Sequence, residues 1–154
     1  MANTIHITPR MSASTTLGGG KQSPLKTAQQ FATGSIRNDS FRIRLIAENL
    51  ANANSTSRTN PYQRKVGVYK SERTKDGHKI PTINKVARDK SPPKIEFRPG
   101  HPDADESGYV MLPNINVVTE TVDMLSAHKG REDAVRAASL MRDSQNELIK
   151  LLRM

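Results

Sequence analysis

The sequence predicts a mainly α-helical chain with a small β region, in which an N-terminal and a C-terminal helix pair as a coiled coil. Apolar residues recur every three or four positions near both ends of the 154-residue chain, and short strand-like runs fill the middle. Pro and Gly are concentrated in the first third and between residues 61 and 113, which leaves the C-terminal part almost free of helix breakers.

Residues 1–27 are expected to form a mobile N-terminal tail. They mix Thr, Ser and Pro with a run of three glycines at 18–20, and their apolar residues show little periodicity. A segment of this composition buries too little apolar surface to offset the entropy lost on ordering.

Residues 28–56 are expected to hold the N-terminal helix of an assembly core. Asp39 falls on the apolar stripe of this helix, where a carboxylate costs stability unless it is paired or solvated. The helix should end within residues 52–60, because Asn, Ser and Thr compete with the backbone hydrogen bonds and Pro61 cannot continue a helix. In the stripe, Ile36, Ile43 and Leu50 lie seven residues apart, and Ile46 and Ala53 fill intervening positions.

Residues 57–113 are expected to form a loop and a small β region. Four runs alternate in the manner of strands, at 66–69, 79–83, 94–97 and 109–112. Turn signals separate these runs, so one or more hairpins are expected.

Residues 114–154 are expected to form the C-terminal helix of the assembly core, about 60 Å long at 1.5 Å per residue. Gly130 and its charged neighbours interrupt the apolar stripe of this helix. A rod of this length needs a partner to cover its stripe, which makes both stripes candidate assembly seams. The C-terminal stripe consists of Val118, Val122, Leu125, Val135, Met141, Leu148 and Leu152.

The net charge of +9 favours acidic partners and gives an alternative function, a basic protein associated with nucleic acid. Against this alternative, the basic stretch from residue 37 to residue 75 has only three aromatic residues, Phe41, Tyr62 and Tyr69, and so lacks the interleaved aromatics of a base-stacking platform. It also carries no zinc-finger or RNA-recognition signature. Only 34% of the residues are hydrophobic and Trp is absent, so we expect the chain to complete its folding against a partner.

One loop contains four possible metal ligands, His101, Asp103, Asp105 and Glu106. Its beginning matches a calcium-binding loop, but Asn114 stands at the twelfth position, where a bidentate Glu is needed. A solvated turn is therefore expected, with a calcium-responsive module as the alternative. The chain has no Cys, and its other histidines have no motif partner. We predict no catalytic, cofactor or metal site.

Two stretches carry a resemblance to a known family. Residues 47–54 resemble the Asn-rich helix end shared by the axial proteins of the bacterial flagellum. Residues 99–118 are similar to the signature of the FlgC family of flagellar basal-body proximal rod proteins. The resemblance covers residues 34–154, and its signature positions are Asn49, Leu50, Ala51, Asn52, Gly100, His101, Pro102, Asp103, Asp105, Gly108, Tyr109, Pro113, Asn114, Asn116 and Val117.

The resemblance implies a structural subunit, not an enzyme. Such a subunit would assemble through its terminal helices, with copies of itself and other rod proteins, into the drive shaft that transmits motor torque. Family members usually carry Tyr and Asn where this chain has Arg131 and Ala134.

The resemblance also changes the expected location. The start of the chain lacks the pattern of a cleaved secretion signal, and no run is long and apolar enough for a transmembrane helix, which by ordinary rules suggests the cytoplasm. A rod protein would instead be exported by the flagellar type III apparatus, without a cleaved signal peptide, into the basal-body rod in the periplasmic space. It would not insert into the membrane.

Overall fold

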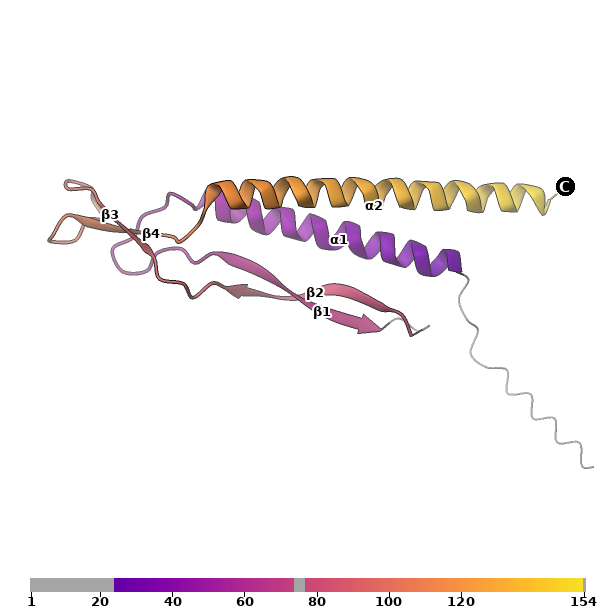
Figure 1. Ribbon diagram of the computed structural model, residues 1–154, viewed down its shortest axis with the longest axis horizontal. Coiled ribbons are helices and arrows are strands. Elements are labelled where there is room, and N and C mark those ends of the chain that lie inside the picture. The colour runs from indigo at the N-terminus through magenta and orange to yellow at the C-terminus, as the bar shows by residue number, and fades with distance from the viewer. Residues whose placement is uncertain (1–23, 74–76, 154) are drawn as a thin grey trace, which may run out of the picture.

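Two long antiparallel helices and two pairs of β-strands make up the described part of the chain, residues 24–73 and 77–153 of a computed structural model (Figure 1). Helix α1 spans Pro24–Ala51 and helix α2 spans Val117–Leu151. Strands β1, Lys65–Arg73, and β2, Lys79–Arg88, form one antiparallel sheet. Strands β3, Lys94–Phe97, and β4, Tyr109–Leu112, form the other. The expected class, mainly helical with a small β region, is confirmed.

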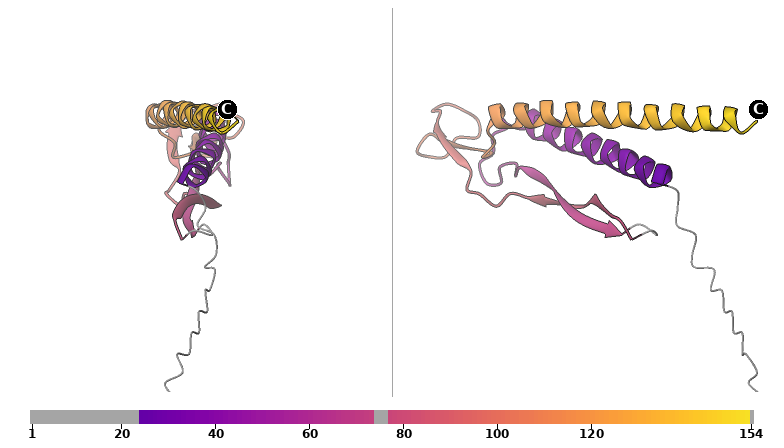
Figure 2. Two further views of the ribbon diagram at one scale, coloured as in Figure 1. Left: turned by 90° about the vertical axis from the view of Figure 1, so that its right-hand side faces the viewer. Right: turned by 45° about the vertical axis from the view of Figure 1, so that its right-hand side comes forward.

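Helix α1 is the middle layer of the molecule. In Figures 1 and 2, α2 lies along one side of α1 and the β1–β2 hairpin lies along the opposite side. The β3–β4 pair lies at the end of the molecule where α1 ends and α2 begins, and the C-terminal end of α2 projects beyond the start of α1. A helix placed between two neighbours needs two packing faces, whereas a single stripe was expected from the sequence.

Helix α1 begins at Pro24, earlier than expected. Pro is favoured at the first position of a helix because its missing N–H would have no partner there. Residues 24–27 of the expected tail are therefore helical and Thr27 is buried, while residues 1–23 lie outside the described residues. The helix ends at Ala51, one residue before the expected range of 52–60, and the Asn52 side chain donates to the carbonyl of Glu48 at 2.8 Å.

Helix α2 begins at Val117, later than the expected residue 114, because Asn116 caps it. The Asn116 side-chain oxygen accepts from the backbone N–H groups of Val118 at 3.0 Å and Thr119 at 3.2 Å. The helix then runs through Gly130 without a break and ends at Leu151, not at residue 154. None of the helices in the described part of the chain is long and apolar enough to cross a membrane.

Strands β3 and β4 match the expected runs, while β1 and β2 are longer than expected. The β1–β2 register runs from Lys65 opposite Arg88 to Arg73 opposite Lys79, with an irregularity between Val68 and Tyr69. The small apolar core lies at the two interfaces of α1 and beneath β4. Its buried members are Ala32, Leu45, Ile46, Ala53, Val110, Leu112, Ile115 and Ala127.

Candidate assembly interface

Small residues make up most of the seam between α1 and α2, with Phe31 and Met141 as its large apolar members. Ala32 and Ala127 are buried in it. The seam opens into a groove of about 570 Å³ near the N-terminal end of α1. The groove is lined by Ala28, Phe31, Ala32, Ser35, Asp39, Gly130, Ala134, Ala137 and Met141. The α2 residues at the seam recur every three or four positions, which is the spacing of a coiled-coil face.

Asp39 faces Gly130 across this seam. A Cβ atom at position 130 would lie 3.1 Å from Asp39 Oδ2, so the glycine leaves room for the carboxylate. Burial raises the pKa of Asp39, and the nearby positive charge of Arg42 partly opposes this effect. The expectation that Asp39 weakens its stripe therefore has a physical basis in the structure.

Asn49 is the centre of a buried polar cluster, with a side chain only 1% exposed. Its amide nitrogen donates to the carbonyl of Lys65 at 2.9 Å and to Glu120 Oε2 at 3.1 Å. Its oxygen accepts from the Tyr62 hydroxyl at 3.0 Å and from the Lys65 N–H at 2.8 Å. All four hydrogen-bonding positions of the amide are therefore used, and they tie α1 to α2 and to β1.

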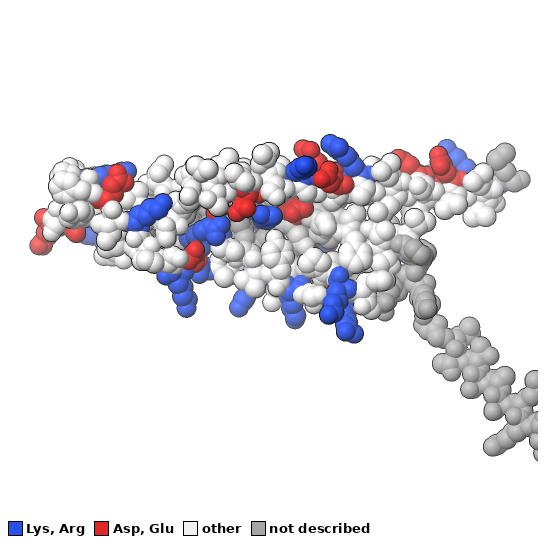
Figure 3. Space-filling model, in the orientation of Figure 1, with Lys and Arg blue, Asp and Glu red and all other residues white. Residues whose placement is uncertain are grey.

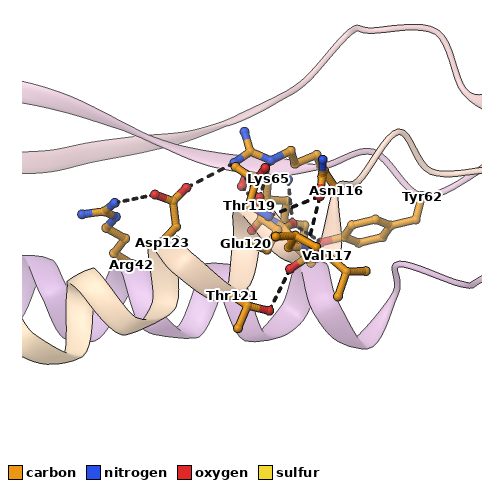
Figure 4. Close-up of polar contacts among 12 residues, drawn as sticks. Arg42, Tyr62, Lys65, Asn116, Val117, Thr119, Glu120, Thr121 and Asp123 are labelled. Carbon is orange, nitrogen blue, oxygen red and sulfur yellow. Dashed lines mark hydrogen bonds and ion pairs between the residues drawn. The ribbon is translucent and has the colours of Figure 1, made fainter.

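Glu120 is equally buried and completes this cluster from α2 (Figure 4). Its Oε1 accepts from Arg64 Nε at 2.6 Å and from Arg64 Nη2 at 2.5 Å. Next to it, Asp123 accepts from Arg42 Nη2 at 3.2 Å, which adds a second link between the helices. A buried carboxylate needs such partners, since an unpaired charge would be costly in this environment.

Tyr62 is held in its neutral form at the edge of the cluster. Burial raises the pKa of its hydroxyl, and the negative charges of Glu48 and Glu120 raise it further, against an opposing effect of Arg88. The protonated hydroxyl is the form that can donate to Asn49. Lys65 also pairs with Glu48, which links β1 to α1 a second time.

The predicted seam residues of α1 lie at the edge of the helix pair. Only Ile46 is buried, and the remaining three are half-buried, namely Ile36, Ile43 and Leu50. The buried Leu45 was not predicted; it lies on the side of α1 that faces the hairpin, within 4 Å of where a Cβ at Gly67 would stand. The α1 stripe thus contributes partly to the contacts within the subunit and leaves apolar surface beside them.

The predicted seam residues of α2 are mostly exposed. Met141 lies in the groove against α1 and is half-buried. Val118 is 73% exposed, Leu125 72% and Leu152 86%, and Val122, Val135 and Leu148 are also exposed. Within one subunit the structure leaves all of these residues except Met141 exposed, so the role of the set as an assembly seam stays a prediction.

The loop between β3 and β4 is organised by its own hydrogen bonds. Asp105 Oδ1 accepts from the N–H groups of Ser107 and Tyr109, both at 2.9 Å, and Gly108 has a φ of +84°. The ring of Tyr109 stacks at a tilt on Phe97, with 5.2 Å between the ring centroids. Gly100 also has a positive φ, 89°. These residues shape a turn.

The segment after α1 is attached to this loop. Thr56 donates to Asp103 Oδ2 at 2.6 Å, and Arg58 donates to the carbonyls of Pro102 at 3.4 Å and Ala104 at 3.0 Å. The His101 ring nitrogen Nδ1 accepts from the Asp103 N–H at 3.1 Å. Within the part of the chain that the structure describes, no group of three or more His, Asp or Glu side chains could hold a metal ion.

The other signature positions have varied surroundings. Asn52 caps α1, Asn116 caps α2, and Pro113 is fully buried between β4 and α2. Asn116 is exposed, as are Ala51, Pro102, Asn114 and Val117.

Sequence reasoning missed Tyr62 and Glu120 as partners of Asn49, and it missed Arg64 as the partner of Glu120. The sequence did carry a signal that Glu120 lies on the face of α2 that packs against α1. Glu120, Ala127, Ala134 and Met141 follow one another at a spacing of seven residues, which places them on the same face of a helix.

The relatives of this chain share one name. No protein-family model matches the chain. It is 34% identical over 134 residues, 84% of this chain and 96% of the relative, to the flagellar basal-body rod protein FlgC of Agrobacterium fabrum. It is 37% identical over 113 residues to the protein of that name in Borreliella burgdorferi, covering 60% of this chain and 74% of the relative. The Salmonella typhimurium protein is 29% identical over 126 residues, with 78% and 92% covered.

Proposed function

This chain belongs to the FlgC family of flagellar basal-body rod proteins, and from that premise we propose that the exposed faces of its two helices are the surfaces by which it assembles. The chain is a structural subunit of the basal-body rod, and other rod components are its partners. The relatives above are rod proteins, which leaves the nucleic-acid alternative without support.

The exposed apolar side chains of α2 are the observation that carries the proposal. Val118, Val122 and Leu125 share one face of α2, and Leu148 and Leu152 are exposed at its C-terminal end. Large apolar side chains that stay in water do not stabilise a lone subunit. A neighbouring subunit that covers them removes their apolar surface from water, which favours assembly. Repetition of such contacts along a rod would multiply this gain at each subunit.

The finer assignments follow from the same premise. We propose that the subunit belongs to the proximal part of the rod, in the periplasmic space, where the rod transmits motor torque. We also propose that it contacts copies of itself and is exported by the flagellar type III apparatus without a cleaved signal. The absence of Cys and the small apolar core would favour passage as an unfolded chain, because little stability must be overcome before export.

We propose further that the chain has no catalytic role. The carboxylates of the β3–β4 loop serve the fold, since Asp103 accepts from Thr56 and Asp105 holds the turn. Glu120 is likewise committed to Arg64 and Asn49.

Charge substitutions on the two helices test the assembly proposal. Leu50→Asp and Leu148→Asp should block rod assembly and motility in a strain that lacks its own copy of the subunit. A buried Leu contact contributes about 2–5 kcal/mol, and a repeated assembly loses it at every subunit. Arg44→Glu and Lys150→Glu are matched controls on exposed positions of the same helices and should change assembly little, within about 1 kcal/mol.

Export of each variant must be measured separately, because a chain that is not exported cannot assemble. If both aspartate variants are exported and still support normal rods, assembly through the terminal helices has to be abandoned.

A further inference from the structure

The charge of the chain is unevenly distributed along its length. Residues 26–90 carry 14 Lys and Arg against 5 Asp and Glu, whereas residues 91–154 carry 8 against 10. The first range contains α1 and the β1–β2 hairpin, and the second contains β3, β4 and α2. Figure 3 shows Lys and Arg side chains along the lower face, where the hairpin lies, and acidic side chains at the far left tip.

A basic groove lies between α1 and the outer end of the hairpin. Its volume is about 540 Å³, and its floor includes Gly34, Ile80 and Thr82. Gly34 favours the close approach of the two elements, because a Cβ there would lie 3.1 Å from Ile80 Cγ2. The cations of the groove are Lys26, Arg37 and Arg73, all exposed.

These three cations are available for an outside partner. No acidic residue in the described part of the chain forms an ion pair with any of them, although Glu72 also lines the groove. A partner that fits this groove should combine carboxylates for its rim with small apolar groups for its floor.

The opposite end of the same molecule has this chemistry. The loop between β3 and β4 carries Asp103, Asp105 and Glu106 among the small residues Pro102 and Ala104. Asp103 and Asp105 also form hydrogen bonds within the fold, and Arg58 donates to two carbonyls of the loop, so the exposed Glu106 is the carboxylate that a partner would meet first. This acidic tip, residues 102–106, lies at the far end of the molecule from the basic groove (Figures 1 and 3).

We propose that the basic groove of one copy of this chain receives the acidic tip of a second copy. The inference rests on the proposed function, because it places a head-to-tail contact inside the rod. Such a contact joins two different patches, so it does not close on itself and can continue along an axis. Opposite charges at the two ends would also orient approaching copies in the same direction.

Charge reversal in the full-length chain tests the contact, with self-association followed by sedimentation velocity at low salt. Arg37→Glu and Glu106→Lys should each weaken self-association about tenfold, since each replaces an attraction with a repulsion. The double variant Arg37→Glu/Glu106→Lys should recover most of the lost affinity, because it restores opposite charges across the contact. Lys85→Glu is the matched control, an exposed charge of the same hairpin outside the groove, and should change association little.

Salt and the helix variant separate this contact from the helix seams. Attraction between the groove and the tip should weaken as salt rises, since the screening length falls from about 30 Å at 0.01 M to about 3 Å at 1 M. Association through apolar helix faces should persist in high salt, and Leu148→Asp should leave the salt-sensitive association unchanged. If the salt-sensitive association is missing while the salt-resistant one is present, the contact between the groove and the tip fails. If the salt-resistant association is missing while the salt-sensitive one is present, assembly through the helix faces fails.

Cross-linking gives a direct test of which surfaces meet. The chain has no Cys, so the double variant Thr33→Cys/Ser107→Cys introduces the only thiols, one in the groove and one at the tip. A short bifunctional reagent should then give a ladder of covalent oligomers. Ser139→Cys/Ser107→Cys, with the first thiol on exposed α2, should not.

Three outcomes would overturn the proposal. They are the absence of a ladder from the groove–tip pair, failure of the charge swap to restore association, and docking of the groove on another rod protein with none on a second copy.

Discussion

Replacing Glu120 with Ala should destabilise the folded chain more than removal of any exposed carboxylate on α2. Glu120 is 1% exposed and accepts three hydrogen bonds, two from the guanidinium of Arg64 and one from the amide of Asn49. Alanine leaves both donors without this acceptor, in the place where α1, α2 and β1 meet.

The magnitude follows from the burial of the two donors. Removing one partner of a buried ion pair costs about 3–5 kcal/mol. The Arg64 side chain is 27% exposed and its Nη2 lies 3.9 Å from Asp123 Oδ2, so it can turn partly to water and to a second carboxylate. We therefore expect the lower end of the range, about 3 kcal/mol. This is a large share of the total stability of about 5–15 kcal/mol that is typical of folded proteins.

Urea unfolding followed by circular dichroism at 222 nm measures this loss. Glu132→Ala is the matched control on the same helix. The Glu132 side chain is 67% exposed, and its carboxylate forms one long ion pair, 3.9 Å from Arg136 Nη2. This substitution should lower the free energy of unfolding by no more than about 0.5 kcal/mol. Glu120→Gln keeps the shape and one acceptor, and should cost about 1.5 kcal/mol if the Ala variant does not fold. Equal unfolding midpoints for Glu120→Ala and Glu132→Ala would refute the reasoning.

Three further predictions concern other parts of the chain. Burial raises the pKa of Asp39, so the stability that Asp39 contributes is present at acid pH and is lost as the pH rises through the raised pKa. Asp39→Asn should therefore raise the Tm at neutral pH. This gain in Tm should shrink as the pH falls toward about 3.9, the ordinary pKa of Asp. Gly108→Ala should lower the free energy of unfolding by about 1–3 kcal/mol, because φ is +84° and the new Cβ would lie 2.8 Å from an aromatic carbon. Gly77→Ala, with φ +85° and open space, should cost less in the same urea titration. Millimolar calcium should leave the Tm unchanged, because the loop at 101–106 lacks the final bidentate ligand; a saturable rise would revive the metal site.

Local signals in the sequence were enough for the elements of the fold. The runs at 94–97 and 109–112 match β3 and β4 because turn residues bound them closely on both sides. The end of α1 was predictable from Asn52, which competes for the backbone as expected. The start of α1 was missed because residues 24–27 lack a full turn of periodic apolar residues, although Pro24 was a usable start signal.

The choice of helix faces could not be predicted from hydrophobicity alone. A search for large apolar residues finds Val118, Val122 and Leu125, which the structure leaves exposed. The face that packs against α1 instead presents Ala127 and Glu120, and a search for large apolar residues selects neither of them. Pairing of Glu120 with Arg64 depends on two residues far apart in the chain, so no local pattern could reveal it.

The composition of the two faces of α2 bears on how the rod would be built. Small residues such as Ala127, Gly130 and Ala134 let the helices of one subunit lie close together while burying little apolar surface. Most large apolar residues of α2, unlike Met141, are exposed within one subunit, and a neighbouring subunit could cover them. If each unit of buried apolar area stabilises assembly about as much as folding, the helix pair within one subunit contributes little stability, and contacts with neighbouring subunits contribute much more. A subunit with this balance would be easy to unfold before export and stable once it is in place. The polar cluster at Asn49 and Glu120 would then fix how the helices meet, because hydrogen bonds of this kind specify geometry where small side chains cannot.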